Sequence, residues 1–457
     1  MKKNLIIFIL SGLVLSTVLY SQIIEKNTHK VYHEKVGADK LYSVEALKGD
    51  LIQIRDILID NHPAVYQFTS KERFDKIFNE QNKKINRPMN LRECHLILMP
   101  LIEMVHCSHT MILLSDKLWN ENELISFPIK LKFIGNKAFI INFYQKNNIL
   151  SPGSEILSIN EIPTAEIIKS IKSLISSDGK NDTRKLAILN LSFPDLFYLR
   201  YGFSDKFDIE YIEYGGSKTD KLTLNPIKRS SYKEYLSSIV KNTSTGDPNL
   251  NFEINHAKKL AVITIKSFGY YNDREKFYSF IDNAFKQINS SNIKNLILDV
   301  RDNMGGDPFC TAHLLSYIES KPVPYFARVY EGGYEHFAEP TPLATKNIFS
   351  GNLYTLINGG CGSSTGHICS LLKFHKLCTF IGEETGGTYE CNDASRIFTT
   401  NETSIKLNVA RMTFTCAVSG LSRENGIMPD YHVEPEINDI IEGKDTVKEF
   451  VYKLIKS

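Results

Sequence analysis

A run rich in serine and glycine could house a nucleophile. Residues 358–367 read NGGCGSSTGH and lie between an apolar stretch expected to be a strand and another expected to be a helix. A serine on such a turn can expose its hydroxyl, and the free N–H groups at the helix start favour a developing negative charge. Nucleophilic catalysis needs both features and a nearby base. Ser363 and Ser364 are therefore candidates, although a serine before a helix is more often only an N-cap.

A second glycine turn follows a buried apolar stretch. Residues 299–307 read DVRDNMGGD. Gly305 and Gly306 have no Cβ, so their backbone N–H groups can approach a substrate closely, as an oxyanion hole requires. A tight turn with no further role is the alternative interpretation.

Histidines and a carboxylate elsewhere could supply a base and the group that orients it. His106, Cys107, Ser108 and His109 follow one another, and the pattern favours a histidine at this helix end as a general base over a metal site, because no third ligand set lies nearby in the sequence. A surface or capping histidine is the alternative interpretation. Glu424 precedes a glycine turn and could orient an imidazole. A solvated loop carboxylate is its alternative interpretation.

A competing motif occupies the same serine run. Residues 362–366 fit G-x-S-x-G with Ser364 at the centre, as in an α/β-hydrolase esterase. That fold would need an acid and then a histidine downstream, for which Asp430 and His432 are available, and an HGGG-type loop, which the sequence lacks. The esterase remains the weaker hypothesis.

The composition and charge narrow the classes of protein. The 457 residues are 42% hydrophobic and 23% charged, which is typical of globular chains and excludes disordered, collagen-like and coiled-coil proteins. The length predicts two to four domains at about 100–200 residues each. The net charge is +2, and no stripe of basic residues accompanies a motif that recognises DNA or RNA, so nucleic acid is not an expected partner.

Three zones must position these residues. Residues 40–115 show helical periodicity, with Ser43 and Ser70 as expected N-caps, and predict a helical domain. Residues 122–225 carry short alternating runs, a Pro-Gly turn and then a helix from Thr164, which is typical of a PDZ-like β-rich domain or another small β domain. Residues 250–457 alternate strands and helices and predict an α/β core. The fold class is therefore multidomain α+β, with a C-terminal α/β domain.

The N-terminus and the cysteines bear on the compartment. Residues 1–21 combine a basic start with a 16-residue apolar run, the layout of a cleaved signal peptide, and predict an exported protein, periplasmic or extracellular, with no membrane partner after cleavage. An uncleaved anchor is the alternative interpretation. Eight cysteines in an exported chain permit disulfides, and Cys391–Cys416 is one candidate pair. Buried free thiols are the favoured alternative.

Taken in chain order, these motifs resemble the tail-specific, or C-terminal-processing, serine proteases. DVRDNMGG at 299–306 is similar to the family's D-[LV]-R-x-N-x-G-G, IGEETGG at 381–387 to its I-G-E-x-T-x-G, and GIMPD at 426–430 to its closing G-[IV]-x-P-D. HPAVY at 62–66 and SHT at 108–110 resemble the helical part of its exported bacterial members. The resemblance spans about residues 40–435 and implies a PDZ-like zone between the helical part and the protease core.

The resemblance also implies roles for single residues. Counting back from Gly382 by the family's spacing of about 19 residues selects Ser363 as nucleophile over Ser364. Many members place a base lysine where this chain has Thr388, so the sequence resembles the tricorn-protease-like branch with a Ser-His-Ser-Glu tetrad. By that resemblance the remaining tetrad members are His109, Ser108 and Glu424. The oxyanion donors would be Gly305, Gly306 and the N–H of Ser364.

The implied activity is hydrolysis of polypeptide substrates through an acyl-enzyme, with no metal or organic cofactor. One departure is Gly366-His367, where the family usually has a glutamate. The alternative is a non-catalytic protein on the same scaffold that binds a peptide or a small hydrophobe, as retinoid-binding relatives of the family do.

Overall fold

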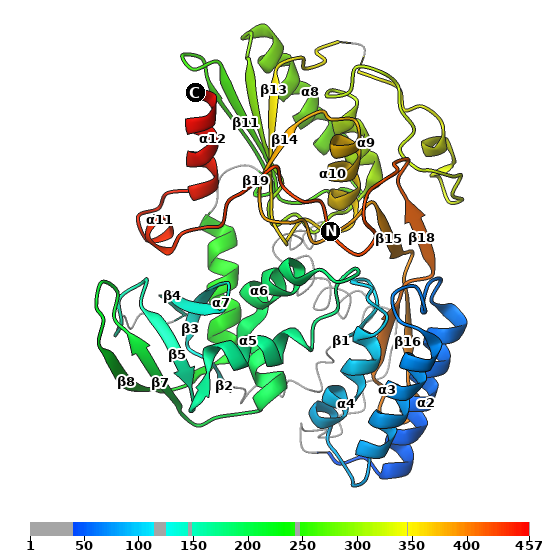
Figure 1. The fold of residues 1–457 in the computed structure, drawn as a ribbon, viewed down its shortest axis with the longest axis vertical. Helices are drawn as coiled ribbons and strands as arrows, with labels where there is room; N and C mark the ends of the chain where they lie inside the picture. The colour runs from blue at the N-terminus through cyan, green and yellow to red at the C-terminus, as the bar shows by residue number, and fades with distance from the viewer. Residues whose placement is uncertain (1–39, 114–124, 145–148, 243–246, 345, 457) are drawn as a thin grey trace, which may run out of the picture.

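The computed structural model describes residues 40–113, 125–144, 149–242, 247–344 and 346–456 (Figure 1). The predicted signal peptide at 1–21 lies outside these residues. Within the described ranges, no helix combines the length and apolar character needed to cross a membrane.

The N-terminal unit is built from three capped helices. They are α2 (Val44–Asn61), α3 (Lys71–Lys84) and α4 (Leu91–Glu103). The hydroxyls of Ser43 and Ser70 accept the N–H groups of Ala46 and Arg73, each over 3.2 Å, so both predicted N-caps are observed. Asn90 and Glu93 form a capping box at the start of α4.

A hairpin from far along the chain completes this unit. Strands β16 (Arg396–Thr399) and β17 (Lys406–Val409) pair with each other, and β17 also pairs with β1 (Met111–Leu113). Leu407 and Val409 are fully buried in the hydrophobic cluster of the helices. The helical unit therefore contains residues well outside the predicted range 40–115.

The middle zone is a small antiparallel sheet with helices packed on it. Its path is β3–β4–β5–β7–β8, with β6 on β5, and a short pair β2–β9 leads into α7. The bounds are β2 (Ile125–Ser126), β3 (Ile129–Ile134), β4 (Lys137–Phe143), β5 (Glu155–Ile159), β6 (Ile162–Pro163), α5 (Thr164–Lys172), α6 (Asp182–Tyr201), β7 (Phe207–Ile212), β8 (Thr219–Leu224), β9 (Ile227–Lys228) and α7 (Arg229–Asn242).

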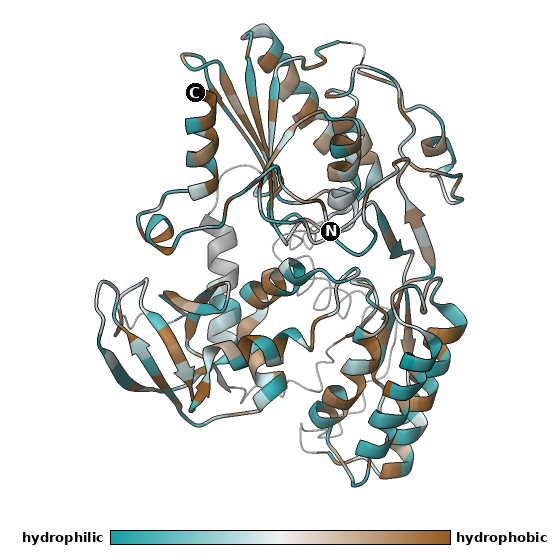
Figure 2. Ribbon diagram, in the orientation of Figure 1, coloured by the Kyte–Doolittle hydropathy of each residue, from teal (hydrophilic) through white to brown (hydrophobic). Residues whose placement is uncertain are grey.

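The C-terminal unit is a six-stranded sheet in the order β10–β11–β12–β13–β14–β19. All neighbours from β11 to β19 are parallel, and only β10 is antiparallel. The strands are β10 (Leu250–Asn255), β11 (Leu260–Ile265), β12 (Asn295–Asp299), β13 (Asn352–Ile357), β14 (Thr379–Gly382) and β19 (Tyr431–His432). Parallel strands buried on both faces are continuously apolar, and Figure 2 shows them mostly brown.

Helices cover both faces of this sheet. Helices α8 (Arg274–Ser290), α9 (Pro308–Leu315) and α10 (Ser364–Phe374) pack on one face, and α12 (Thr446–Lys456) packs on the other through Val447 and Val451 (Figure 1). Strands β15 (Glu390–Asp393) and β18 (Met412–Thr415) form a separate pair close to the helical unit. The remaining short elements are η2 (Glu335–Ala338) and α11 (Ile437–Ile441). The predicted α/β class is confirmed.

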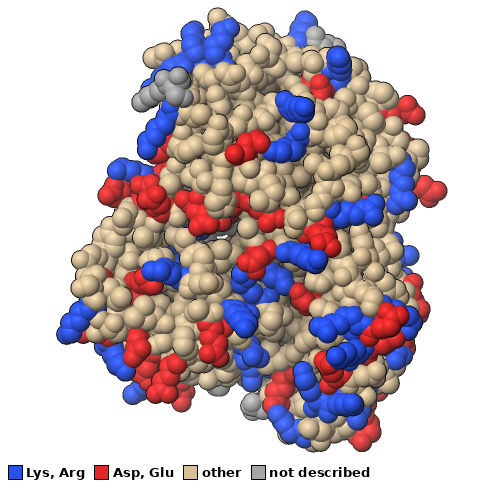
Figure 3. All heavy atoms as spheres, in the orientation of Figure 1, with Lys and Arg blue, Asp and Glu red and all other residues tan. Residues whose placement is uncertain are grey.

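All eight cysteines are free thiols, and seven are buried. The suggested Cys391–Cys416 disulfide is wrong, because the β15–β18 register sets Cys391 opposite Phe414. On the face drawn in Figure 3, basic and acidic side chains are interspersed, as the small net charge implies.

Candidate active site

The candidate nucleophile occupies a strained turn between a strand and a helix. Strand β13 ends at Ile357 and α10 begins at Ser364, so Ser363 stands at the N-cap with φ 50° and ψ −128°. A positive φ costs a residue other than glycine about 1–3 kcal/mol and is characteristic of functional sites. The Ser363 side chain makes no capping hydrogen bond and is only half-buried. Its hydroxyl is therefore held out of the helix and is accessible.

Gly305 packs directly against this serine. A Cβ on Gly305 would lie 2.7 Å from Ser363 Cβ and 3.0 Å from the backbone nitrogen of Ser364, and its φ is +103°. Both the contact and the backbone angle require glycine here. The two glycine-containing turns identified in the sequence are therefore brought together at one edge of the sheet.

Hydrogen bonds between the two turns hold them in register. The Gly362 N–H donates to the Asn303 carbonyl over 3.0 Å, and Asn358 Nδ2 donates to Asp302 Oδ1 over 2.8 Å. Just before the turn, Arg301 bonds both Asp299 and Asp445. Although burial opposes it, Arg301 holds the pKa of Asp299 below its ordinary value, so this carboxylate stays ionised.

The backbone N–H groups that are free near Ser363 differ in part from the predicted oxyanion donors. The Gly305 N–H donates to Asn303 Oδ1 over 2.9 Å and is thus used inside its own turn. Among the hydrogen bonds within the described residues, none engages the N–H of Gly306 or of Ser364. The N–H groups of Gly306 and Ser364 therefore remain candidate oxyanion donors, whereas Gly305 supplies the space beside Ser363.

The candidate base is joined through a serine to a buried carboxylate. Ser108 Oγ lies 3.3 Å from His109 Nδ1 and donates to Asp178 Oδ2 over 2.8 Å. The Ser108 N–H donates to the other oxygen of Asp178, also over 2.8 Å. Because the hydroxyl proton is committed to the carboxylate, Ser108 accepts from Nδ1–H, and Nε2 of His109 is left free to accept a proton.

Glu424 does not take the position expected for the acidic tetrad member. Its carboxylate is about half exposed and pairs with Lys180 at 2.7 Å. Only its backbone borders the site, since the Glu424 carbonyl accepts the Lys180 N–H. Asp178, which is 6% exposed, holds Ser108 instead. Asp178 is not among the residues expected from the sequence, because it belongs to no recognised motif and lies 70 positions from Ser108.

The Nε2 side of His109 faces the core domain. Asp393 Oδ2, at the end of β15, is 3.7 Å from Nε2. His367, one turn along α10 from Ser363, is buried, and burial together with a smaller effect of the His109 charge lowers the pKa of His367 to about 4. The structure thus brings His109 beside α10. His109 and Ser363, both within the described residues, form no side-chain hydrogen bond with each other. Such bonds are often long or absent when no substrate is bound.

The loop before α6 is the second feature that the sequence did not reveal. Asn181 caps α6 by accepting the Arg184 N–H over 2.8 Å, and it donates to the Thr385 carbonyl over 2.5 Å. The buried Arg184 side chain then passes Gly362, with Nη1 3.0 Å from the site of a Cβ there. Burial lowers the pKa of Arg184, and the charge of Asp178 opposes this shift. This loop therefore supports both the carboxylate and the nucleophile turn.

Three possible metal ligands meet at the histidine but suit a metal poorly. Ligand atoms of Cys107, His109 and Asp178 lie within 4.8 Å of one another. Both oxygens of Asp178 are already bonded to Ser108. Burial raises the pKa of Cys107 to about 12, which disfavours the thiolate that metals bind. The hydrogen-bonded chain accounts for these groups without a metal.

Comparison with known proteins gives a family match over part of the chain and a similar fold over most of it. Residues 259–433 match the model of peptidase family S41. Mature CPAF covers 90% of this chain and 97% of its own, at 13% identity and a TM-score of 0.63. CPAF complexed with lactacystin is similar at 13% identity, a TM-score of 0.64, and 90% and 98% coverage. The s499a mutant of CPAF is 12% identical, with a TM-score of 0.67, and covers 90% of this chain and 97% of its own. At these identities the likeness concerns the fold alone. A search of the curated proteins finds no match.

Proposed function

We propose that the chain, a serine peptidase whose residues 259–433 match the model of peptidase family S41, is an endopeptidase with Ser363 as nucleophile and His109 as base. One observation carries this assignment. Ser363 is held at positive φ against Gly305, while the N–H groups of Gly306 and Ser364 beside it have no partner within the described residues. A nucleophile next to unengaged donors is the arrangement that acyl transfer requires.

The proposed chemistry begins with the hydroxyl of Ser363. Its oxygen attacks a peptide carbonyl carbon, and Nε2 of His109 accepts the hydroxyl proton. The negative charge that forms on the carbonyl oxygen is stabilised by the N–H groups of Gly306 and Ser364. His109 then donates its proton to the departing amine, which leaves an acyl-enzyme, and water attacks that ester with His109 again as base.

Ser108 and Asp178 have a positioning role in this scheme. Ser108 accepts from Nδ1 of His109 and fixes the tautomer in which Nε2 is basic. Asp178 stabilises the imidazolium through Ser108, because its charge polarises the shared hydroxyl. The site draws Ser363 from the core, His109 from the helical unit and Asp178 from the loop before α6. All three units must be docked for activity.

A cleavage assay tests the proposal. The purified protein, Ser363→Ala and Ser364→Ala would each be incubated with an unfolded protein, and fragments would be identified by mass spectrometry. We expect fragments from the wild type and from Ser364→Ala, whose backbone N–H is retained, and none from Ser363→Ala. Fragments from Ser363→Ala with none from Ser364→Ala would reject Ser363 and support the esterase-type nucleophile.

We also propose that the protein is exported to the periplasm or beyond the cell. The support is the basic start and the 16-residue apolar run within residues 1–21. N-terminal sequencing of protein recovered from the periplasm and medium of a bacterial host should give a start near residue 22. Recovery only from the cytosol, with Met1 retained, would reject export.

A further inference from the structure

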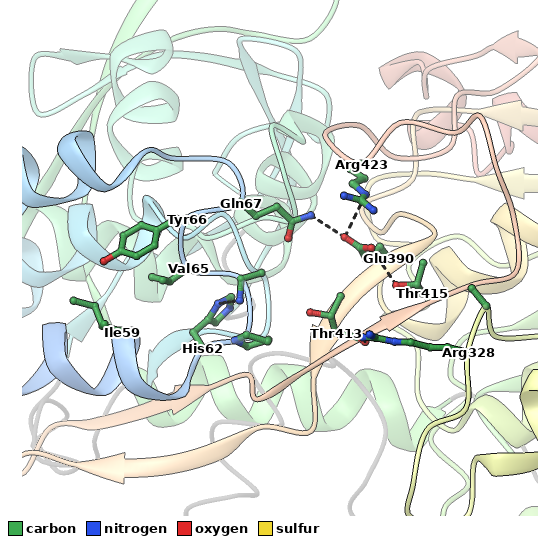
Figure 4. A pocket seen from close by; sticks show the side chains of 13 residues that line it. Ile59, His62, Val65, Tyr66, Gln67, Arg328, Glu390, Thr413, Thr415 and Arg423 are labelled. Carbon is green, nitrogen blue, oxygen red and sulfur yellow. Dashed lines mark hydrogen bonds and ion pairs between the residues drawn. The ribbon is translucent and has the colours of Figure 1, made fainter.

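A pocket separate from the nucleophile turn lies between the helical unit and the β15–β18 pair. Its volume is about 730 Å³, within the range usual for ligand sites (Figure 4). The helical side contributes Ile59 and the HPAVY segment at 62–66, which the proposed mechanism does not use. The core side contributes Glu390, Arg328 and Arg423. The pocket thus combines an apolar wall with a charged wall.

The charged wall carries more positive than negative charge. Arg423 Nε lies 3.6 Å from Glu390 Oε1, and Gln67 and Thr415 also donate to this carboxylate. Arg328 donates to the Thr413 carbonyl over 3.0 Å and to Tyr330 Oη over 3.1 Å. In the described ranges, no carboxylate lies within ion-pair distance of Arg328. The charges of Arg423 and Glu390 cancel, so the exposed Arg328 guanidinium gives the pocket a net positive charge.

His62 adds a buried donor without a partner. It is 5% exposed, and its Nδ1 accepts the Ala64 N–H over 3.1 Å, so Nε2 bears the proton. Nε2 has no hydrogen-bond partner among the described residues. Figure 4 shows His62 entering the pocket from the helical side, across from Arg328. A buried donor of this kind is stabilised by a ligand that brings an acceptor.

The pocket is close to the nucleophile along the chain. A Cβ on Gly387 would lie 2.9 Å from the Ser363 nitrogen, and Glu390 follows Gly387 by three residues. Three residues span at most about 10 Å. The Glu390 edge of the pocket therefore lies about 10 Å along the chain from the contact with Ser363, so an extended substrate that runs from Ser363 toward Glu390 reaches the pocket with its third or fourth residue from the scissile bond.

We propose that this pocket binds an acidic side chain of the polypeptide substrate, an Asp or Glu three or four residues from the cleaved bond. Arg328 would pair with the carboxylate, and the Nε2–H of His62 would donate to it. The apolar wall would hold the adjoining part of the chain. This inference rests on the proposed peptidase function, which it makes specific for one class of sequence.

Peptide binding to the Ser363→Ala protein tests the pocket without turnover. The probes are fluorescent dodecapeptide pools of uncharged residues with one fixed position, which is Asp, Asn or Lys. By fluorescence anisotropy we expect the Asp pools to bind about tenfold more tightly than the Asn pools at the best fixed position, because a charge-assisted hydrogen bond replaces a neutral one. Equal binding of Asp and Asn pools would overturn the inference. Tightest binding of Lys pools would assign recognition to Glu390 instead.

A matched pair of arginine variants locates the effect. Arg328→Gln should abolish the preference for Asp, while Arg396→Gln should retain it. Both arginines are exposed and each lies over an aromatic ring, at 5.1 Å from Tyr330 and 5.5 Å from Phe398. An equal loss in both variants would reject the pocket. An Asp preference in Ser363→Ala with no cleavage by the wild type would keep the pocket and reject the peptidase proposal. Cleavage by the wild type with no Asp preference in Ser363→Ala would keep the peptidase proposal and reject the pocket.

Discussion

Ser108 donates its hydroxyl to Asp178 over 2.8 Å, and its backbone N–H donates to the second oxygen of the same carboxylate. This double contact fixes the serine against a loop 70 positions away. The lone pair of Ser108 is then directed at His109. The Nδ1 side of the candidate base is therefore held by a segment that precedes α6, while Asp393 of β15 lies 3.7 Å from its Nε2.

Asp178→Asn should reduce kcat by about 10²–10⁴-fold, because an uncharged amide cannot stabilise the imidazolium and can reverse the Ser108 hydrogen bond. Glu424→Gln is the matched control, since among the described residues the half-exposed Glu424 carboxylate forms an ion pair with Lys180 alone, and the substitution should change kcat less than about threefold. Steady-state kinetics on a cleavable peptide would compare them. A larger loss for Glu424→Gln would restore the tetrad expected from the family resemblance.

The two histidines near α10 should behave differently. His109→Ala should lower kcat by about 10⁴–10⁶-fold, as for removal of the base in other serine hydrolases. His367 is enclosed by the rings of Tyr325 and Phe326, at 6.2 and 5.8 Å, so His367→Gln should mainly lower the melting temperature. Kinetics at a temperature where both variants are folded would separate the effects. Equal losses of kcat would mean that His367 takes part in proton transfer.

Gly305→Ala should inactivate the protein by displacing the nucleophile. The new methyl group would stand 2.7 Å from Ser363 Cβ, so the Ser363 turn and the nearby N–H groups must move. Loss of one oxyanion donor alone costs about 10²–10³-fold in kcat. Gly332→Ala is the control, because its φ of +89° is also positive but no atom lies within 4 Å. Similar activity in the two variants would contradict the packing described here.

Acid should destabilise the protein through its buried histidines. Burial lowers the pKa of His62, His95 and His367 to about 4, from 6.5. The unfolded chain binds protons as the pH falls through 6.5, whereas the native state does so only near 4. Stability is therefore full above pH 6.5 and declines toward pH 4, at up to about 1.4 kcal/mol per pH unit for each histidine.

Urea unfolding between pH 6.5 and 5 would measure this slope before most carboxylates titrate. The matched variant is His95→Gln, which removes one fully buried imidazole. It should be less dependent on pH than the wild type in this window. A slope unchanged by the substitution would show that His95 is protonated in the native state.

Local signals predicted many elements correctly. Strands and helices alternate over residues 250–457 as the sequence predicts, and α2 and α3 begin directly after the predicted N-caps Ser43 and Ser70. These succeed because periodicity and capping are properties of neighbouring residues. The proximity of Ser363 and Gly305 could also be predicted, because both residues follow parallel strands at the same edge of the sheet.

Contacts between segments far apart in the sequence could not be predicted from local patterns. Nothing near Asp178 distinguishes it from other loop aspartates until Ser108 is placed beside it. The hairpin β16–β17 was assigned to the core by position, yet Leu407 is buried among the helices. The Cys391–Cys416 pairing failed for a related reason, because strand register is set by the partner strand and not by the spacing of cysteines.

Covalent labelling of the purified protein with a fluorophosphonate, followed by tandem mass spectrometry of the modified peptide, tests most directly whether Ser363 is the nucleophile. Activated serine nucleophiles react with such reagents, whereas ordinary serines do not. The account predicts one adduct on Ser363, lost in Ser363→Ala and strongly reduced in His109→Ala. An adduct on Ser364, or labelling that persists unchanged in Ser363→Ala, would contradict it.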